Sequence, residues 1–197
     1  MFGSTAKVSN NAVSEESFYY FCRIKTLIMT TLYLVRHGET EDNVAQIMQG
    51  QTQGRLTERG RQQAMMLAGQ LAGRHFDAFV SSDLRRAVDT AAIVAGPHAM
   101  TVETTPLLRE RDWGGFTGRH IPELQGVPWP DDIETLEQLM ERASTFIDYV
   151  KSRHSGQCVL AVGHGIINKA VQAVYHGLPM NRIARMDNAE VRILELE

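Results

Sequence analysis

The sequence predicts an α/β protein, a three-layer α/β/α sandwich with a mainly parallel central sheet. Short apolar runs alternate along the chain with longer segments in which apolar residues recur at helical spacing. The apolar runs are nearly continuous, which is typical of parallel strands that are covered by helices on both faces. The length of 197 residues suits one domain of this kind.

The first strand and the first long helix have separate signals. Residues 31–36 form an apolar run that predicts a strand. Residues 56–74 then carry the i, i+3, i+4, i+7 stripe of a helix. Thr57 is the expected N-cap, and Glu58 suits the positive end of the helix dipole. We therefore expect a strand, a loop and a helix in this order.

The rest of the chain continues the alternation, apart from one irregular segment. Residues 107–132 are rich in glycine, proline and aromatic residues, which predicts loops. A long amphipathic helix is expected from Ile133 to Arg153, with apolar residues such as Leu136 facing inward. The other expected elements are a strand at 76–82, a helix at 82–97, strands at 100–105 and 157–165, a helix at 165–177 and a strand at 190–197.

Residues 1–28 differ in composition from the rest of the chain. The segment begins with polar and small residues, and Arg23 and Lys25 interrupt its more apolar end. It lacks the apolar core and cleavage site of a signal peptide. We expect residues 1–28 to be a disordered or dispensable extension and residues 29–197 to form the folded domain.

Charge and cysteine content argue against several classes of protein. The formal net charge is −3, whereas nucleic-acid-binding domains usually carry a basic excess. No apolar run reaches the length of a transmembrane helix. Cys22 and Cys158 are far apart in the sequence, which fits a reducing compartment and a buried Cys158. We therefore expect a cytoplasmic protein without nucleic-acid or membrane partners.

Two predicted strands end in the same way, with His-Gly at 37–38 and at 164–165. The carboxyl ends of parallel strands meet at one edge of a sheet, where ligands bind in open α/β folds. Gly38 and Gly165 would let a ligand approach the backbone closely. The helix that follows His164 would direct free N–H groups toward the same edge, and these favour an anion.

Further charged residues are expected at this edge. Arg85 and Arg86 lie in the first turn of a predicted helix, where cations oppose the helix dipole. Glu110 closely follows the third predicted strand. Arginine matches phosphate oxygens bidentately, and neutral imidazole is a nucleophile near pH 7. The set suits a phosphate ester, a small-molecule substrate.

Four motifs in order carry a resemblance to a known family. LVRHGET, SSDLRRAVDTA, LRERDWGGFTG and AVGHG, between Met29 and Glu197, resemble the histidine phosphatase superfamily and its phosphoglycerate mutase-like fold. The resemblance implies that His37 attacks phosphorus and becomes phosphohistidine. It also implies that Arg36, Arg86 and His164 hold the phosphoryl oxygens.

The resemblance assigns the remaining roles as well. Glu110 matches the acid that protonates the leaving oxygen, and Asn43 matches a polar residue that often lines the pocket. Arg85 is then expected at the surface. We see no metal-ligand signature in the sequence, and we expect neither a metal nor another cofactor.

The family contains both hydrolases and mutases, so the resemblance alone does not select the reaction. The segment between Glu110 and His164 is short and resembles that of bacterial phosphatases of this family. A short cap lets water reach the phosphohistidine, which favours a phosphomonoesterase acting on a small phosphorylated metabolite. Two alternatives stay open: a 2,3-bisphosphoglycerate-dependent phosphoglycerate mutase, and an inactive phosphate-binding or scaffolding protein. A homodimer also stays open.

Overall fold

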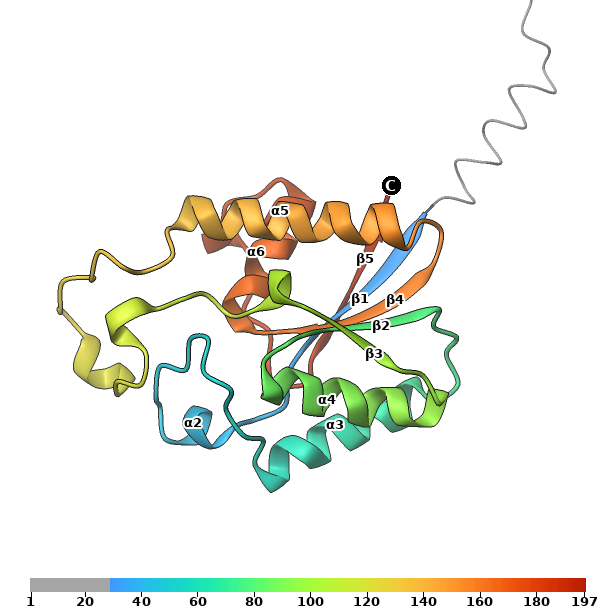
Figure 1. Cartoon of the computed structure of the whole chain (residues 1–197), viewed down its shortest axis with the longest axis horizontal. Helices are drawn as coiled ribbons and strands as arrows, with labels where there is room; N and C mark the ends of the chain where they lie inside the picture. Colours follow the sequence, from blue (N-terminus) through green and yellow to red (C-terminus); the bar gives the residue numbers. More distant parts are fainter. Residues whose placement is uncertain (1–28) are drawn as a thin grey trace, which may run out of the picture.

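The computed structural model describes residues 29–197, so the expected extension at 1–28 lies outside the described residues. The strands form one five-stranded sheet in the order β3-β2-β4-β1-β5 (Figure 1). The strands are β1 (Thr30–Arg36), β2 (Ala78–Ser82), β3 (Val102–Thr105), β4 (Cys158–Gly163) and β5 (Val191–Leu196). All neighbouring pairs run parallel except β1 and β5, which pair antiparallel. The prediction of a mainly parallel sheet is confirmed.

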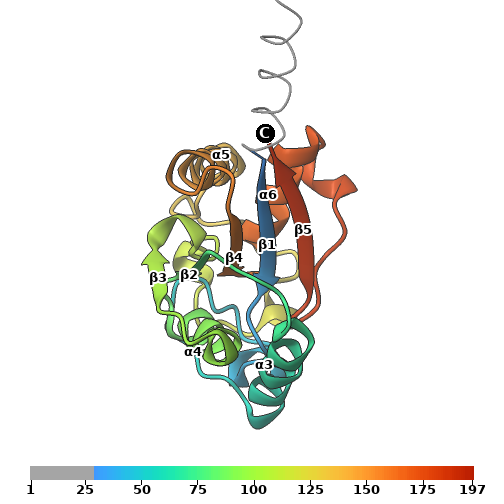
Figure 2. The same cartoon turned by 90° about the vertical axis from the view of Figure 1, so that its right-hand side faces the viewer.

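Helices cover both faces of the sheet (Figure 2). Leu32 and Leu34 of β1 pack into an apolar cluster with the helices of one face, and the alternate residues Tyr33 and Val35 pack into the cluster of the other face. Each fully buried side chain of this size contributes about 1.5–3 kcal/mol to folding. One face carries α5 (Leu136–Arg153) and α6 (Gly165–His176), and the other carries α3 (Glu58–Leu71) and α4 (Arg85–Ala95).

Short elements lie in the connections. They are α2 (Glu41–Val44) and the 3-10 turns Gly96–His98, Pro106–Leu108, Gly114–Phe116, Ile121–Leu124 and Met180–Arg182. Within residues 29–197, no helix is long and apolar enough to cross a membrane. The irregular segment that the sequence predicts at 107–132 is confirmed, since it contains only such turns.

The predicted start of the long helix α5 is wrong by three residues. Thr135 is its N-cap and forms a capping box with Gln138, in which each side chain bonds the backbone N–H of the other residue. Ile133 is buried but precedes the helix, and Leu136 is 54% exposed rather than inward-facing. The cap fixes the first turn so that the buried face begins at Leu139.

Cys158 is half-buried, which corrects the prediction that it is buried. It is the first residue of β4, and its N–H donates to Asp77 at 2.8 Å near the amino end of the strand. The core covers the strand fully only from Val159 onward.

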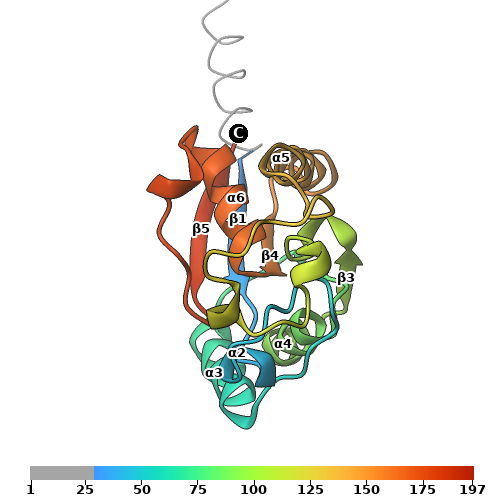
Figure 3. The same cartoon turned by 90° about the vertical axis from the view of Figure 1, so that its left-hand side faces the viewer.

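The carboxyl ends of the parallel strands meet at one edge of the sheet. The register pairs Arg36 with Gly163 and Ser82 with Thr105. Figure 3 views the molecule from this edge, with α2 and the irregular segment in front of the strand ends. The fold therefore brings the motifs of the sequence to one place.

Gly38, two residues after the end of β1, packs against the first turn of α3. A Cβ at this position would overlap the backbone carbonyl oxygen of Gly60, and a Cβ at Gly60 would overlap the carbonyl of Glu39. Helix packing alone therefore requires glycine at position 38, and the close approach of a ligand that the sequence suggested stays a prediction.

Gly38→Ala is expected to lower the free energy of unfolding by about 1–3 kcal/mol, because the added methyl group overpacks this contact. Gly69→Ala is the matched control, since a Cβ there meets no atom within 4 Å. That control should raise the stability by about 0.5–1 kcal/mol, because alanine is the better helix former. Urea unfolding of both variants measures these changes. A Gly38→Ala protein with the free energy of unfolding of the wild type would contradict the packing of Gly38 against α3.

Candidate active site

His37 is held as a neutral imidazole in one tautomer. Its Nδ1 lies 2.7 Å from the carbonyl oxygen of Gly38. A carbonyl oxygen only accepts, so Nδ1 carries the proton and Nε2 has the free lone pair. Burial holds the pKa of His37 well below its ordinary value of 6.5, and the charge of Arg86 lowers it further. At pH 7, His37 therefore presents an unprotonated Nε2.

The backbone of His37 is anchored on both sides. Its N–H donates to the carbonyl of Gly163 at 3.1 Å, which joins the ends of β1 and β4. The Asn188 amide donates to the carbonyl oxygen of His37 at 3.0 Å. The side chain itself is only 3% exposed. These contacts fix the imidazole before any ligand arrives.

His164 is the N-cap of α6 and lies beside His37, with the two ring centroids 5.0 Å apart. Its Nδ1 accepts from Arg86 Nε at 3.1 Å. Arginine only donates, so the proton of the neutral His164 ring lies on Nε2. This Nε2 is buried and has no hydrogen-bond partner among residues 29–197. Burial, followed by the charge of Arg86, holds the pKa of His164 well below 6.5.

Arg86 is a buried cation that connects His164 to the loop after α2. It is 1% exposed, and burial lowers its pKa to about 10, so it stays charged at pH 7. Its Nη2 donates to the carbonyl of Gly50 at 2.8 Å, and its Nη1 donates to that of Thr52. Arg85 is exposed, as the resemblance implied, and it pairs with Asp89.

Arg36 supplies a second buried cation. Its Nη1 donates to the carbonyl of Met186 at 2.7 Å, and its Nε has no hydrogen-bond partner within the described part of the chain. Burial, followed by the charge of Arg185, lowers the pKa of Arg36. A Cβ at Gly165 would lie 3.6 Å from Arg36 Nε and 3.7 Å from the Glu110 carboxylate. Gly165 therefore keeps the space between these two groups open.

The carboxylate of Glu110 binds the start of α6. It accepts from the N–H groups of Ile166, at 3.1 and 3.2 Å, and Ile167, at 3.2 Å, and also from Arg111 N at 2.9 Å. The expectation that free N–H groups of this helix bind the ligand anion is therefore corrected. A side-chain carboxylate of the protein takes that place, because helix N-termini favour any anion within reach.

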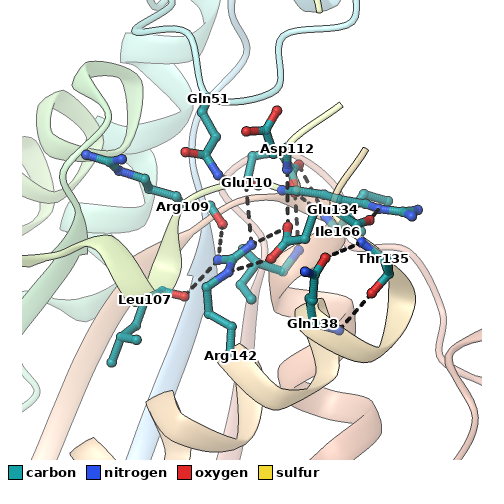
Figure 4. A network of polar contacts seen from close by, with 12 residues as sticks. Gln51, Leu107, Arg109, Glu110, Asp112, Glu134, Thr135, Gln138, Arg142 and Ile166 are labelled. Carbon is teal, nitrogen blue, oxygen red and sulfur yellow. Dashed lines mark hydrogen bonds and ion pairs between the residues drawn. The ribbon is translucent and has the colours of Figure 1, made fainter. Parts of the chain in front are cut away.

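An ion pair between Arg142 and Glu134 lies beside Glu110 and supports its backbone (Figure 4). Arg142 of α5 binds Glu134 through two contacts of 2.8 and 2.7 Å. The Nη1 of Arg142 also donates to the carbonyls of Leu107 and Arg109, at 3.0 and 2.6 Å. This network ties the backbone just before Glu110 to α5, so the carboxylate is carried by a rigid support rather than by a free loop.

A pocket of about 240 Å³ opens between these groups. His164 lies behind its wall, against His37 and Arg86. Asn43 closes one side, where its Oδ1 accepts from Thr40 N at 3.2 Å within the capping box of α2. The predicted residues that line the pocket are Arg36, His37, Asn43, Arg86, Glu110 and Gly165. The structure thus brings the whole predicted set together.

Other lining residues were not predicted from the sequence. Gln49 is buried with its Oε1 unpartnered among the described residues, and Trp113 and Arg185 also line the pocket. Gly50 and Gly54 follow Gln49 and could have indicated a tight loop, since both have positive φ values, of 52° and 60°. No sequence signal indicated Arg185 or the support from Arg142.

The fold and the site define a class of protein. A mainly parallel sandwich presents two histidines and two buried arginines at one edge of its sheet, as the resemblance implied. The family model of the histidine phosphatase superfamily (branch 1) matches residues 32–197. The chain therefore belongs to the histidine phosphatase superfamily.

Individual relatives differ in their names. Phosphoserine phosphatase 1 from Hydrogenobacter thermophilus is 29% identical over 86% of this chain and 88% of its own. A Yersinia pestis protein named "Probable phosphoglycerate mutase GpmB" is 32% identical over 80% of each chain. A solved structure of mycobacterial glucosyl-3-phosphoglycerate phosphatase with VO3 is 27% identical, covers 84% of this chain and 96% of that chain, and has a TM-score of 0.74.

The two buried neutral histidines predict that acid destabilises the protein. An unfolded histidine binds a proton near pH 6.5, whereas folded His37 and His164 stay neutral well below that pH. Unfolding therefore takes up protons below pH 6.5, and stability falls as the pH is lowered. The slope should approach about 1.4 kcal/mol per pH unit for each of the two histidines.

Urea unfolding between pH 7 and pH 5, in buffers without phosphate, measures this slope. His37→Gln should remove about half of it, because only His164 then takes up a proton. His75→Gln should leave it unchanged, since His75 is exposed. Equal slopes in the wild type, His37→Gln and His75→Gln would contradict the conclusion that His37 is neutral in the folded protein.

Proposed function

We propose that this chain is a phosphomonoesterase that hydrolyses a small phosphorylated metabolite through a phosphohistidine at His37. One observation carries the proposal: the Nδ1–H of His37 is bound to the Gly38 carbonyl, which leaves Nε2 as the nucleophile among buried cations. The phosphatase names of relatives that match over more than four fifths of the chain agree with it.

In the first step, Nε2 of His37 attacks phosphorus, the N–P bond forms and the ester P–O bond breaks. Protonated Glu110 gives its proton to the leaving oxygen. Arg36 Nε and His164 Nε2 are buried donors without partners in residues 29–197, and we assign them to the phosphoryl oxygens. Fixed donors of this kind stabilise the charge that is spread over these oxygens in the transition state.

In the second step, water attacks phosphorus, Glu110 takes its proton and the N–P bond breaks. Inorganic phosphate and neutral His37 are released. The two arginines supply the positive charge that the phosphoryl group needs, and neutral His164 adds an N–H donor, so we propose that no metal takes part. Activity that is unchanged after dialysis against EDTA is the expected result, and restoration by an added divalent cation would contradict it.

A phosphoglycerate mutase is the second candidate, and the similarity to a relative named as a probable phosphoglycerate mutase favours it. Between Pro106–Leu108 and α5 the chain forms only the short turns Gly114–Phe116 and Ile121–Leu124. Ile121 lines the pocket and is still partly exposed. A cap of this size favours access of water to the phosphoenzyme, and hence hydrolysis.

One experiment tests the proposal and separates the two reactions. The protein is mixed with a ³²P-labelled ester, quenched in alkali within milliseconds, and digested for mass spectrometry. An alkali-stable, acid-labile phosphoryl group on His37 is expected. In a parallel reaction with 3-phosphoglycerate as acceptor, label should appear mainly in inorganic phosphate. Label found mainly in bisphosphoglycerate would favour the mutase, and absence of bound label would favour an inactive binding protein.

A further inference from the structure

Arg185 stands at the mouth of the pocket on a firmly held backbone. Its side chain is exposed, yet it lines the same pocket as Arg36 and His37. Met186, the next residue, and Ile183, two residues before, are buried, and the Met186 carbonyl accepts the 2.7 Å hydrogen bond from Arg36. The guanidinium can therefore reach a ligand while its backbone stays fixed relative to the phosphoryl site.

Packing does not account for the charge of Arg185. No carboxylate lies within 4.0 Å of it among residues 29–197. The nearby Glu190 is already engaged, with Arg192 at 2.6 Å and the Asp187 N–H at 2.6 Å. Arg185 and Arg36 line the same pocket, and the charge of Arg185 lowers the pKa of Arg36, whereas Glu110, Asp187 and Glu190 raise it. Two like charges facing one pocket oppose each other unless an anion binds between them.

The charges that line the pocket indicate what this anion is. Arg36 and Arg86 match the two negative charges of a phosphate dianion, and the Glu110 carboxylate is already bound by the N–H groups of α6 and Arg111. Within the described part of the chain, Arg185 is then the one charged lining residue without a counterpart, and Met48 and Trp113 add apolar surface to the same pocket. A single guanidinium matches a single carboxylate in charge and in bidentate geometry.

We propose that Arg185 selects phosphate esters whose leaving group carries a carboxylate. This inference rests on the proposed phosphatase activity and names its class of substrate. Arg185 contacts the part of the substrate remote from phosphorus, so it acts in the ground state and in the transition state alike. Its loss should therefore raise KM much more than it lowers kcat.

The test compares 3-phosphoglycerate with its primary amide, which has a similar shape but lacks the carboxylate charge. Arg185→Gln should lower kcat/KM for the acid about tenfold or more, the expected loss of a charge-assisted hydrogen bond. It should change kcat/KM for the amide less than about twofold, because the neutral group forms no ion pair. Arg185→Lys should restore part of the loss. Arg182→Gln is the matched control, since Arg182 is exposed on the same segment and outside the pocket lining.

The outcomes separate the two proposals. Equal losses on both esters in Arg185→Gln, or no preference of the wild type for the acid, would overturn the role of Arg185. If the same wild-type sample still hydrolyses 4-nitrophenyl phosphate, the proposed phosphatase activity is supported even though the role of Arg185 is overturned. A wild type that releases phosphate from none of the three esters would overturn the proposed function, and the inference with it.

Discussion

Replacing His37 with alanine is expected to lower kcat at least about 10⁴-fold, because a covalent route loses its nucleophile and no neighbouring group can replace it. His164 cannot, since its Nδ1 is bound to Arg86 and its Nε2 carries the proton. Steady-state phosphate release and the alkali-quenched phosphoenzyme should both disappear. The measurement is made with an aryl phosphate, so that the leaving group needs no protonation.

The variant should still fold. His37 is a buried group that stays neutral beside the cations Arg36 and Arg86, and it receives no stabilising ion pair from them. Its removal also leaves the backbone bonds to Gly163 and Asn188 in place. Circular dichroism and thermal unfolding check this, and His75→Ala serves as the exposed control. A full burst of bound phosphate in the His37→Ala protein would contradict the assignment of the nucleophile.

The position of the site could be predicted because strand ends have a sequence signal. The apolar runs before His37 and His164 end abruptly in polar residues, and parallel strands place such ends at one edge. Arg86 could be separated from Arg85 only through the family motif. The structure agrees, with Arg86 buried and Arg85 exposed. The catalytic roles themselves stay predictions until the kinetics are measured.

The contacts that hold the site residues in place could not be predicted, because they join residues that are far apart in the sequence. Arg142 lies far along the chain from Leu107 and Glu110, and nothing in its helical neighbours indicates its partners. The occupation of the α6 N-terminus by Glu110 likewise follows from tertiary placement. The start of α5 differs, since the sequence Thr-Leu-Glu-Gln from Thr135 to Gln138 is a capping-box signature that was readable in advance.

Replacing Glu110 with alanine is expected to lower kcat/KM for the hydrolysis of alkyl phosphates by about 10²–10⁴-fold, the range that a positioned general acid contributes. Hydrolysis of 4-nitrophenyl phosphate should fall by less than about tenfold, since that leaving group departs as a stable anion. The measurement is kcat/KM for a series of esters whose leaving groups span several pKa units. The dependence of rate on leaving-group pKa should become steeper in the variant.

The structure makes this comparison necessary, because Glu110 also binds the N–H groups of Ile166 and Ile167. Its removal would loosen the start of α6 beside His164, and a purely structural role would therefore slow all esters alike. Glu103→Ala, which changes an exposed carboxylate on β3, controls for the loss of charge. A uniform loss across the series would show that Glu110 holds α6 and that the proton comes from elsewhere. A loss that grows with leaving-group pKa requires the carboxyl group to leave those N–H donors, at least in part, when it protonates the substrate.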